Sequence, residues 1–243
     1  MGKEIFTFGG KLFLKLIIVN IMCFFIIMSF SVLSTAAFTK NIGYTAYGTT
    51  SESSEQQELY TYYYDDGEDT KLKEYEDSGV TVSKSTIRSP MSKTGNILFL
   101  TVSQVFSLLI LIAFIYPNIW DLGTKDSNLV RFKHKEEDRL KGLKIGLVAV
   151  VPLYLARIAL VVFKLGAFPK FPLALHRFFN SSFYALIQAI TGKAVTVGEA
   201  SWWRMILLFL PPIIIPAIAW LAYALGIRNF SIGEKLIYKK NKE

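Results

Sequence analysis

The chain has 243 residues, 52% of them hydrophobic, with 19 phenylalanines and a formal net charge of +8. This hydrophobic content is too high for a single soluble core and indicates a membrane protein, so the basic residues must first be assigned to membrane sides before they indicate any partner. The single cysteine, Cys23, excludes an intramolecular disulfide and a multi-cysteine metal site.

Four segments are long and apolar enough to cross a bilayer as helices, which takes about 20 residues each. They are residues 16–38, 97–116, 145–163 and 205–226. We therefore predict an all-α membrane protein with four transmembrane helices. Small residues follow the first apolar run, as in a secretory signal, but the run is longer than the roughly 7 to 15 residues of such signals. This length favours an uncleaved first helix over a cleaved one.

The charged residues are distributed unevenly between the predicted spans. Residues 1–15 carry three basic residues and one acid, residues 117–144 carry seven and five, and residues 227–243 carry five and two. Residues 39–96 carry six basic and ten acidic residues, a net charge of −4. Lysine and arginine near span ends are retained in the cytoplasm. We therefore predict a cell-membrane protein with both termini and the basic 117–144 loop inside, and we interpret the basic stretches as topology signals and lipid contacts, not as a nucleic-acid site.

The acidic outer loop, residues 39–96, is rich in tyrosine. Residues 59–64 have strand composition, residues 65–68 have turn composition, and residues 71–75 are placed to return as the second strand of a small hairpin, with 80–86 as a third short strand. Such strands make a poor core on their own, so we expect the loop to lean on the membrane surface or on a partner. The predicted partner contacts are Tyr60, Tyr62, Tyr63 and Tyr64.

Residues 172–191, within an outer segment spanning 164–204, are less apolar than the four spans. Their polar side chains follow one helical stripe and their aromatic side chains the opposite one. We predict an interfacial amphipathic helix on the outer side. A fifth span would place the basic tail outside, against the charge rule, while re-entrant insertion stays open as an alternative.

Arg157 lies inside the third predicted span, where a charged side chain costs about 2.5 to 3.5 kcal/mol on insertion scales. Snorkelling to the outer surface, about 9 Å away, is opposed by the lean of helical side chains toward the helix N-terminus. Three prolines in the last span, beginning at Pro211, must bend or break that helix and free backbone carbonyls. Arg157 therefore requires acceptors within the membrane.

Residues at a similar depth in the other spans supply these acceptors in our prediction. Arg157 is expected to donate to Gln104, to Tyr154 one turn away, and to carbonyls freed near Leu207 and Leu208. The predicted intramembrane polar layer consists of Arg157, Gln104, Tyr154, Ser31 and Pro211.

The sequence offers little support for an enzyme. No predicted span contains Asp or Glu, and the chain lacks the HExxH, GxSxG, P-loop and dinucleotide patterns. His134 and His176 fall on opposite sides of the membrane in the predicted topology, so we expect no catalytic residue, metal site or cofactor.

The leading hypothesis is a non-enzymatic accessory or interaction protein that presents its outer loop to an extracytoplasmic or membrane partner. The alternative is a small transporter or channel subunit, in which Arg157 and the break at Pro211 form an anion-attracting site open to the outer face.

Overall fold

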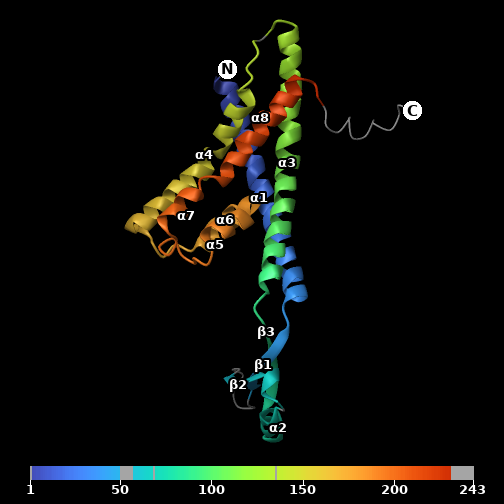
Figure 1. Ribbon diagram of the computed structural model, residues 1–243, viewed down its shortest axis with the longest axis vertical. Coiled ribbons are helices and arrows are strands. Elements are labelled where there is room, and N and C mark those ends of the chain that lie inside the picture. The colour runs from blue at the N-terminus through green and yellow to red at the C-terminus, as the bar shows by residue number, and fades with distance from the viewer. Residues whose placement is uncertain (1, 50–56, 68, 135, 231–243) are drawn as a thin grey trace, which may run out of the picture. The chain divides into compact units, whose positions relative to one another are not determined.

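The computed structural model describes residues 2–49, 57–67, 69–134 and 136–230, and the chain divides into two compact units. The helical unit comprises Met1–Met28 and Leu100–Glu243, and the sheet unit comprises Ser29–Phe99. Figure 1 shows the elements of each unit. Most of the basic tail predicted at 227–243 lies outside the described residues.

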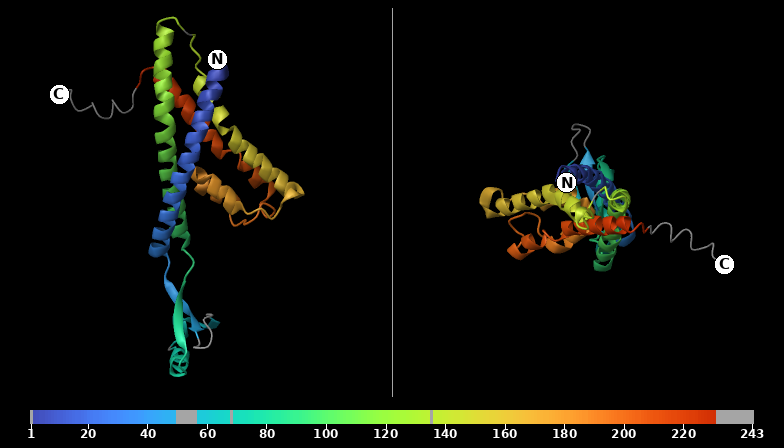
Figure 2. Two further views of the ribbon diagram at one scale, coloured as in Figure 1. Left: turned by 180° about the vertical axis from the view of Figure 1, so that it is seen from behind. Right: turned by 90° about the horizontal axis from the view of Figure 1, so that it is seen from above.

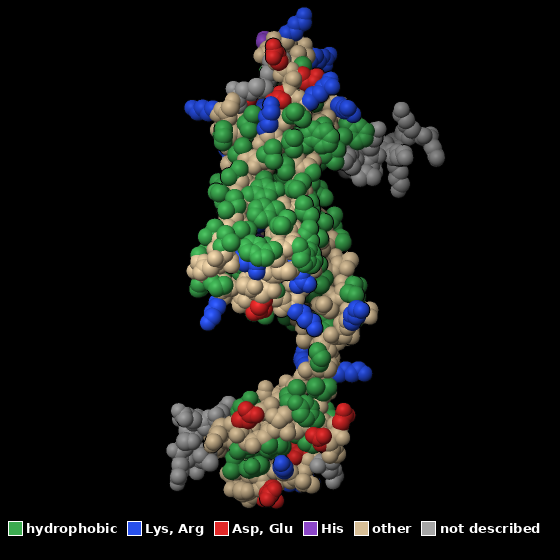
Figure 3. All heavy atoms as spheres, turned by 60° about the vertical axis from the view of Figure 1, so that its left-hand side comes forward, with side chains coloured by type: hydrophobic (Ala, Val, Ile, Leu, Met, Phe, Trp, Pro, Cys, Tyr) green, Lys and Arg blue, Asp and Glu red, His purple; other side chains and the backbone are tan. Residues whose placement is uncertain are grey.

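Among the described residues, four helices are long and apolar enough to cross a membrane, as the sequence predicted. The first three are α1 (Gly2–Phe38), α3 (Lys93–Arg131) and α4 (Lys141–Val162) with its π-helical extension η2 (Phe163–Ala167). The fourth runs over Trp202–Ile227. On the face shown in Figure 3, hydrophobic side chains form a broad band over the helical unit, with charged side chains gathered beyond both ends of the band. This distribution is consistent with a multi-pass membrane protein.

The helices α1 and α3 are longer than the predicted spans. Pro117 does not end α3, which continues to Arg131, because one missing N–H can be tolerated where the helix is packed. Between α3 and α4, residues 132–134 and 136–140 are non-helical, and Lys133 has a positive φ of 58°. The connection between α3 and α4 is therefore short.

The last span is broken at the prolines, as predicted. It begins with α7 (Trp202–Leu207), passes through the 3-10 turn η4 (Pro211–Ile213), and resumes as α8 (Ile214–Ile227). Each proline removes an N–H from the helical ladder. The break thus leaves carbonyl groups that need donors from elsewhere.

Small residues let α8 pack closely against its neighbours, α4 and α3 (Figure 2). A Cβ added to Gly146 of α4 would lie 2.5 Å from the Cα of Pro216 in α8. A Cβ on Gly226 of α8 would overlap the carbonyl oxygen of Trp120 in α3. Close approach through glycine is a common way for membrane helices to associate.

The amphipathic helix predicted over 172–191 is instead two short helices, α5 (Leu173–Phe179) and α6 (Tyr184–Thr191), joined by the 3-10 turn η3 (Ser181–Phe183). Asn180 lies off helical geometry at φ −122° and ψ 41°. Its side chain donates to the carbonyl of His176, and the Ser181 hydroxyl donates to the carbonyl of Phe178. Such side-chain bonds compete with the helical ladder and explain the break.

The sheet unit holds a three-stranded antiparallel sheet in the order β2-β1-β3. Its strands are β1 (Asn41–Thr49), β2 (Gln57–Tyr63) and β3 (Thr81–Arg88). Between β2 and β3 lie the 3-10 turn η1 (Tyr64–Asp66) and the helix α2 (Thr70–Asp77). The third strand falls where the sequence predicted it.

The predicted pairing of 59–64 with 71–75 is wrong. Residues 71–75 belong to α2, and the partner of β2 is β1, which the sequence reading did not identify as a strand. Asp69 accepts a hydrogen bond from the backbone N–H of Leu72 at 3.2 Å and so caps α2. A capping aspartate followed by helix-forming Lys, Leu and Glu residues favours a helix over a strand.

Candidate functional site

Arg157 lies in the C-terminal third of α4, with only 1% of its surface exposed. Its Nε donates to the carbonyl oxygen of Leu208 at 2.7 Å, and one terminal nitrogen donates to the carbonyl oxygen of Leu153 at 2.8 Å. The other terminal nitrogen has no hydrogen-bond partner among the described residues. The Leu208 carbonyl is available because residue 212, its donor in a regular helix, is a proline. Arg157 thus stabilises the broken span.

The other members of the predicted polar layer are not all joined to Arg157. The side chain of Gln104 donates to the carbonyl of Ser182 at 3.1 Å and accepts from the N–H of Leu186 at 3.2 Å, so it connects α3 to the η3–α6 segment. The ring of Tyr154 stacks on Phe209.

Two predicted members of the layer remain. Pro211 is buried in η4, within the broken span that Arg157 contacts. Ser31 belongs to the sheet unit. The structure therefore brings Arg157 to the proline break, while Gln104 makes its contacts elsewhere.

A second set of polar side chains is buried where α5 ends. His176 is 4% exposed, and Asn180 and Ser182, which follow it closely in the sequence, are also buried. Asn20 of α1 accepts from both the N–H and the hydroxyl of Ser182, at 3.0 and 2.8 Å. Burial, together with the positive charges of Arg157 and Arg177, lowers the pKa of His176 to about 3. His176 is therefore neutral at physiological pH.

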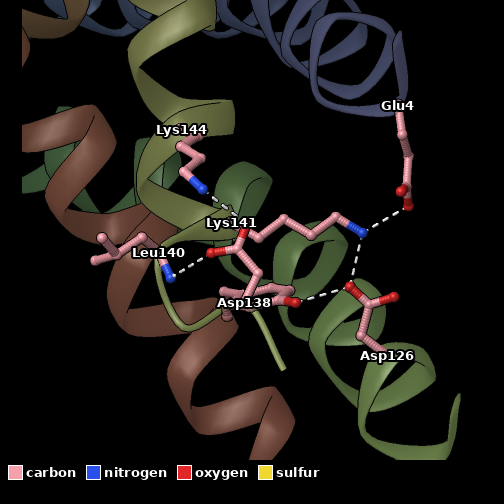
Figure 4. Close-up of polar contacts among 7 residues, drawn as sticks. Glu4, Asp126, Asp138, Leu140, Lys141 and Lys144 are labelled. Carbon is pink, nitrogen blue, oxygen red and sulfur yellow. Dashed lines mark hydrogen bonds and ion pairs between the residues drawn. The ribbon is translucent and has the colours of Figure 1, made fainter. Parts of the chain in front are cut away.

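A buried ionic cluster joins four helices and was not predicted (Figure 4). Lys141, at the start of α4, has a side chain that is 0% exposed. Its Nζ lies 2.5 Å from a carboxylate oxygen of Glu4 in α1 and 2.7 Å from one of Asp126 in α3. The hydroxyl of Tyr223 in α8 donates to the same Asp126 oxygen at 2.7 Å. Beside the cluster, Asp138 pairs with Lys144 at 2.9 Å.

The predicted spans do not include Glu4 or Asp126, and Lys141 belongs to a basic stretch that is predicted to be a topology signal. Because α1 starts at Gly2 and α3 runs to Arg131, both Glu4 and Asp126 lie on apolar helices. Glu4 and Lys141 are 137 residues apart, so no local spacing in the sequence signals their contact. Removal of one member of such a buried pair leaves an uncompensated charge, which makes the cluster a structural clamp.

An apolar cavity of about 670 Å³ lies between α1, α4 and α5. Its lining side chains are hydrophobic apart from Asn20, and they include Pro152, Phe24 and Phe178. Arg157 does not line this cavity. The guanidinium group is therefore enclosed by protein and does not face this opening.

In the sheet unit, the four predicted contact tyrosines fall into two pairs. Tyr60 and Tyr62 are half-buried: the hydroxyl of Tyr60 donates to Asp69 at 2.8 Å, and that of Tyr62 donates to the carbonyl of Gly67. Tyr63 and Tyr64 are exposed, at 44% and 52%. The first pair is hydrogen-bonded within the unit, and the second pair is open to solvent or to a partner.

Among the described residues, no group of three or more His, Cys, Asp and Glu side chains could hold a metal ion. No family model matches the chain, and no similar protein or solved structure emerges from comparison with known proteins.

Proposed function

We propose that this chain is a non-enzymatic accessory or interaction protein of the cell membrane, which presents its sheet unit on the outer face to a partner protein. The observation that carries the proposal is that the acidic, tyrosine-rich segment folds as a compact unit with its own sheet and with Tyr63 and Tyr64 exposed. Exposed aromatic residues are enriched at protein interfaces and among the residues that dominate binding.

The charge distribution supports the orientation. Basic residues outnumber acids in residues 1–15, 117–144 and 227–243, while residues 39–96 have a net charge of −4. The positive-inside rule then places both termini in the cytoplasm and the sheet unit outside. A cysteine introduced at Thr81 in a Cys23→Ser variant tests this orientation. A membrane-impermeant cysteine reagent should label it on intact cells, and labelling only after lysis would contradict the orientation.

A photo-crosslinking amino acid at Tyr63 or Tyr64 of the full-length protein tests the function. We expect both positions to give the same defined crosslinked species. The matched control is Thr81, which is also exposed but lies on β3, at the opposite edge of the sheet from β2. Equal crosslinking from Thr81, or no crosslinking from the two tyrosines, would contradict the proposal.

The alternative, a small transporter or channel subunit, has one observation in its favour. Arg157 is buried with one terminal nitrogen unpartnered and with no ion pair to an acidic side chain of the described residues. Anion flux into proteoliposomes that is lost in Arg157→Lys would establish this function. If flux is absent, or is unaffected by the substitution, the transport function is rejected and Arg157 has only the structural role described above.

A further inference from the structure

A small pocket of about 210 Å³ lies beside the half-buried tyrosines of the sheet unit. Tyr60 and Tyr62 point to the same face because side chains alternate along a strand, and they form one part of the lining. Asp66 and Asp69, from η1 and the start of α2, form another part together with Lys71. The pocket therefore combines aromatic rings with carboxylates. It is smaller than the roughly 300 to 1,000 Å³ of drug-sized ligand sites and suits a single chemical group.

Asp69 is held in place by several hydrogen bonds. One oxygen accepts from the hydroxyl groups of Tyr60, at 2.8 Å, and Tyr44, and the other accepts from the N–H of Leu72 at 3.2 Å. These donors hold the carboxylate at the wall of the pocket. All of them are neutral groups, so they do not cancel its negative charge. The negative potential of this wall favours a positively charged ligand.

The tyrosine rings of this cluster already lie beneath ammonium groups of the chain itself. Lys84 Nζ lies 4.8 Å from the ring centre of Tyr44, and Lys71 Nζ lies 6.0 Å from that of Tyr60. Both distances are within the range in which a cation is attracted to the face of an aromatic ring. Lys71 is exposed on α2 and lines the pocket, so its flexible side chain can leave when another cation arrives.

We propose that this pocket binds an alkylammonium group, and that this group is a lysine side chain of the partner. The inference rests on the proposed function, because it names the chemistry by which the sheet unit recognises its partner. The bound ammonium replaces that of Lys71 over the ring of Tyr60 and lies next to the carboxylates of Asp66 and Asp69. Quaternary ammonium compounds fit the same chemistry and serve as probes.

The test is calorimetric titration of the full-length protein in detergent micelles with three probes. They are Nα-acetyl-lysine methylamide, choline, and the neutral choline analogue 3,3-dimethyl-1-butanol. We expect saturable binding of the two cations and none of the neutral compound. Asp69→Asn keeps an acceptor for the cap of α2 but removes the charge, and it should weaken binding about three- to tenfold.

Lys71→Gln gives the sharper result. Removal of the competing ammonium should strengthen binding of both cations, whereas Lys73→Gln makes the same change of charge on an exposed residue of α2 that does not line the pocket and should leave the affinity unaltered. Equal effects of the two substitutions, or equal binding of the neutral analogue, would overturn the proposal. Binding of choline without binding of the lysine probe would overturn the assignment to a lysine.

The crosslinking experiment separates this inference from the proposed function. Crosslinks from Tyr63 and Tyr64 without binding of either cation would overturn the ammonium-binding proposal but not the proposed function. Binding of the cations without crosslinks would overturn the proposal of a partner protein, while the pocket would still be shown to bind an alkylammonium group.

Discussion

Arg157 Nε donates to the carbonyl oxygen of Leu208 at 2.7 Å, and this is the carbonyl that Pro212 deprives of its helical donor. A charge buried in one long apolar helix thereby completes the backbone hydrogen bonding of another. The arrangement explains why an arginine and a proline break occur together in this chain, since each meets a need that the other creates.

The first prediction concerns this pair. Arg157→Met should lower the free energy of unfolding by about 1 to 3 kcal/mol, because the buried Leu208 carbonyl loses its donor. In a Pro212→Ala background, the alanine N–H can supply that donor, so the same arginine substitution should cost less. Unfolding in mixed micelles with increasing SDS measures all four proteins. Strictly additive effects would contradict the coupling.

The second prediction concerns the buried ionic cluster. Lys141→Met should destabilise the protein by about 3 to 5 kcal/mol, because the buried carboxylate of Asp126 loses its ion pair with the Lys141 ammonium group. The additional substitution Asp126→Asn should recover part of the loss. Lys144→Met is the matched control, since its pair with Asp138 has a lysine side chain that is 45% exposed and should contribute less than about 1 kcal/mol. Thermal unfolding in detergent compares them, and equal losses from both lysines would disprove the clamp.

The third prediction is a pH dependence. Since the pKa of His176 is lowered to about 3, the unfolded chain binds a proton near pH 6.5 that the folded protein does not bind until much lower pH. Stability should therefore fall as the pH drops from 6.5 toward 3, by up to about 1.4 kcal/mol per pH unit from this group. His176→Gln should flatten the profile, whereas His134→Gln, at an exposed position, should not alter it.

The fourth prediction concerns helix packing. Gly226→Ala should destabilise the protein because the added Cβ would overlap the backbone of Trp120, and α3 and α8 would have to separate. Gly10→Ala, in α1 and with nothing within 4 Å of the added Cβ, should be neutral or stabilise by about 0.5 to 1 kcal/mol through helix propensity. Retention of full stability by Gly226→Ala in a thermal-unfolding assay would contradict the close packing.

Features that depend on neighbours in the chain were predictable from the sequence. The four apolar segments are helices because an uninterrupted apolar run of that length meets the needs of a membrane-spanning helix by itself. The break at Pro211 and the strand at 81–88 likewise follow from local chemistry, the first from a missing N–H and the second from β-branched residues.

Features that depend on distant partners were decided only by the tertiary structure. The central strand β1 became a strand by pairing with β2 and β3 on both sides, and Gln104 found its acceptor and donor in the η3–α6 segment. Lys141 reads as an ordinary basic residue until folding buries it between Glu4 and Asp126. The sequence by itself thus determined which segments are apolar, helical or broken, because those properties arise within a few turns of the chain. The tertiary structure decided which polar groups meet, because each pairing depends on how separate helices and strands pack.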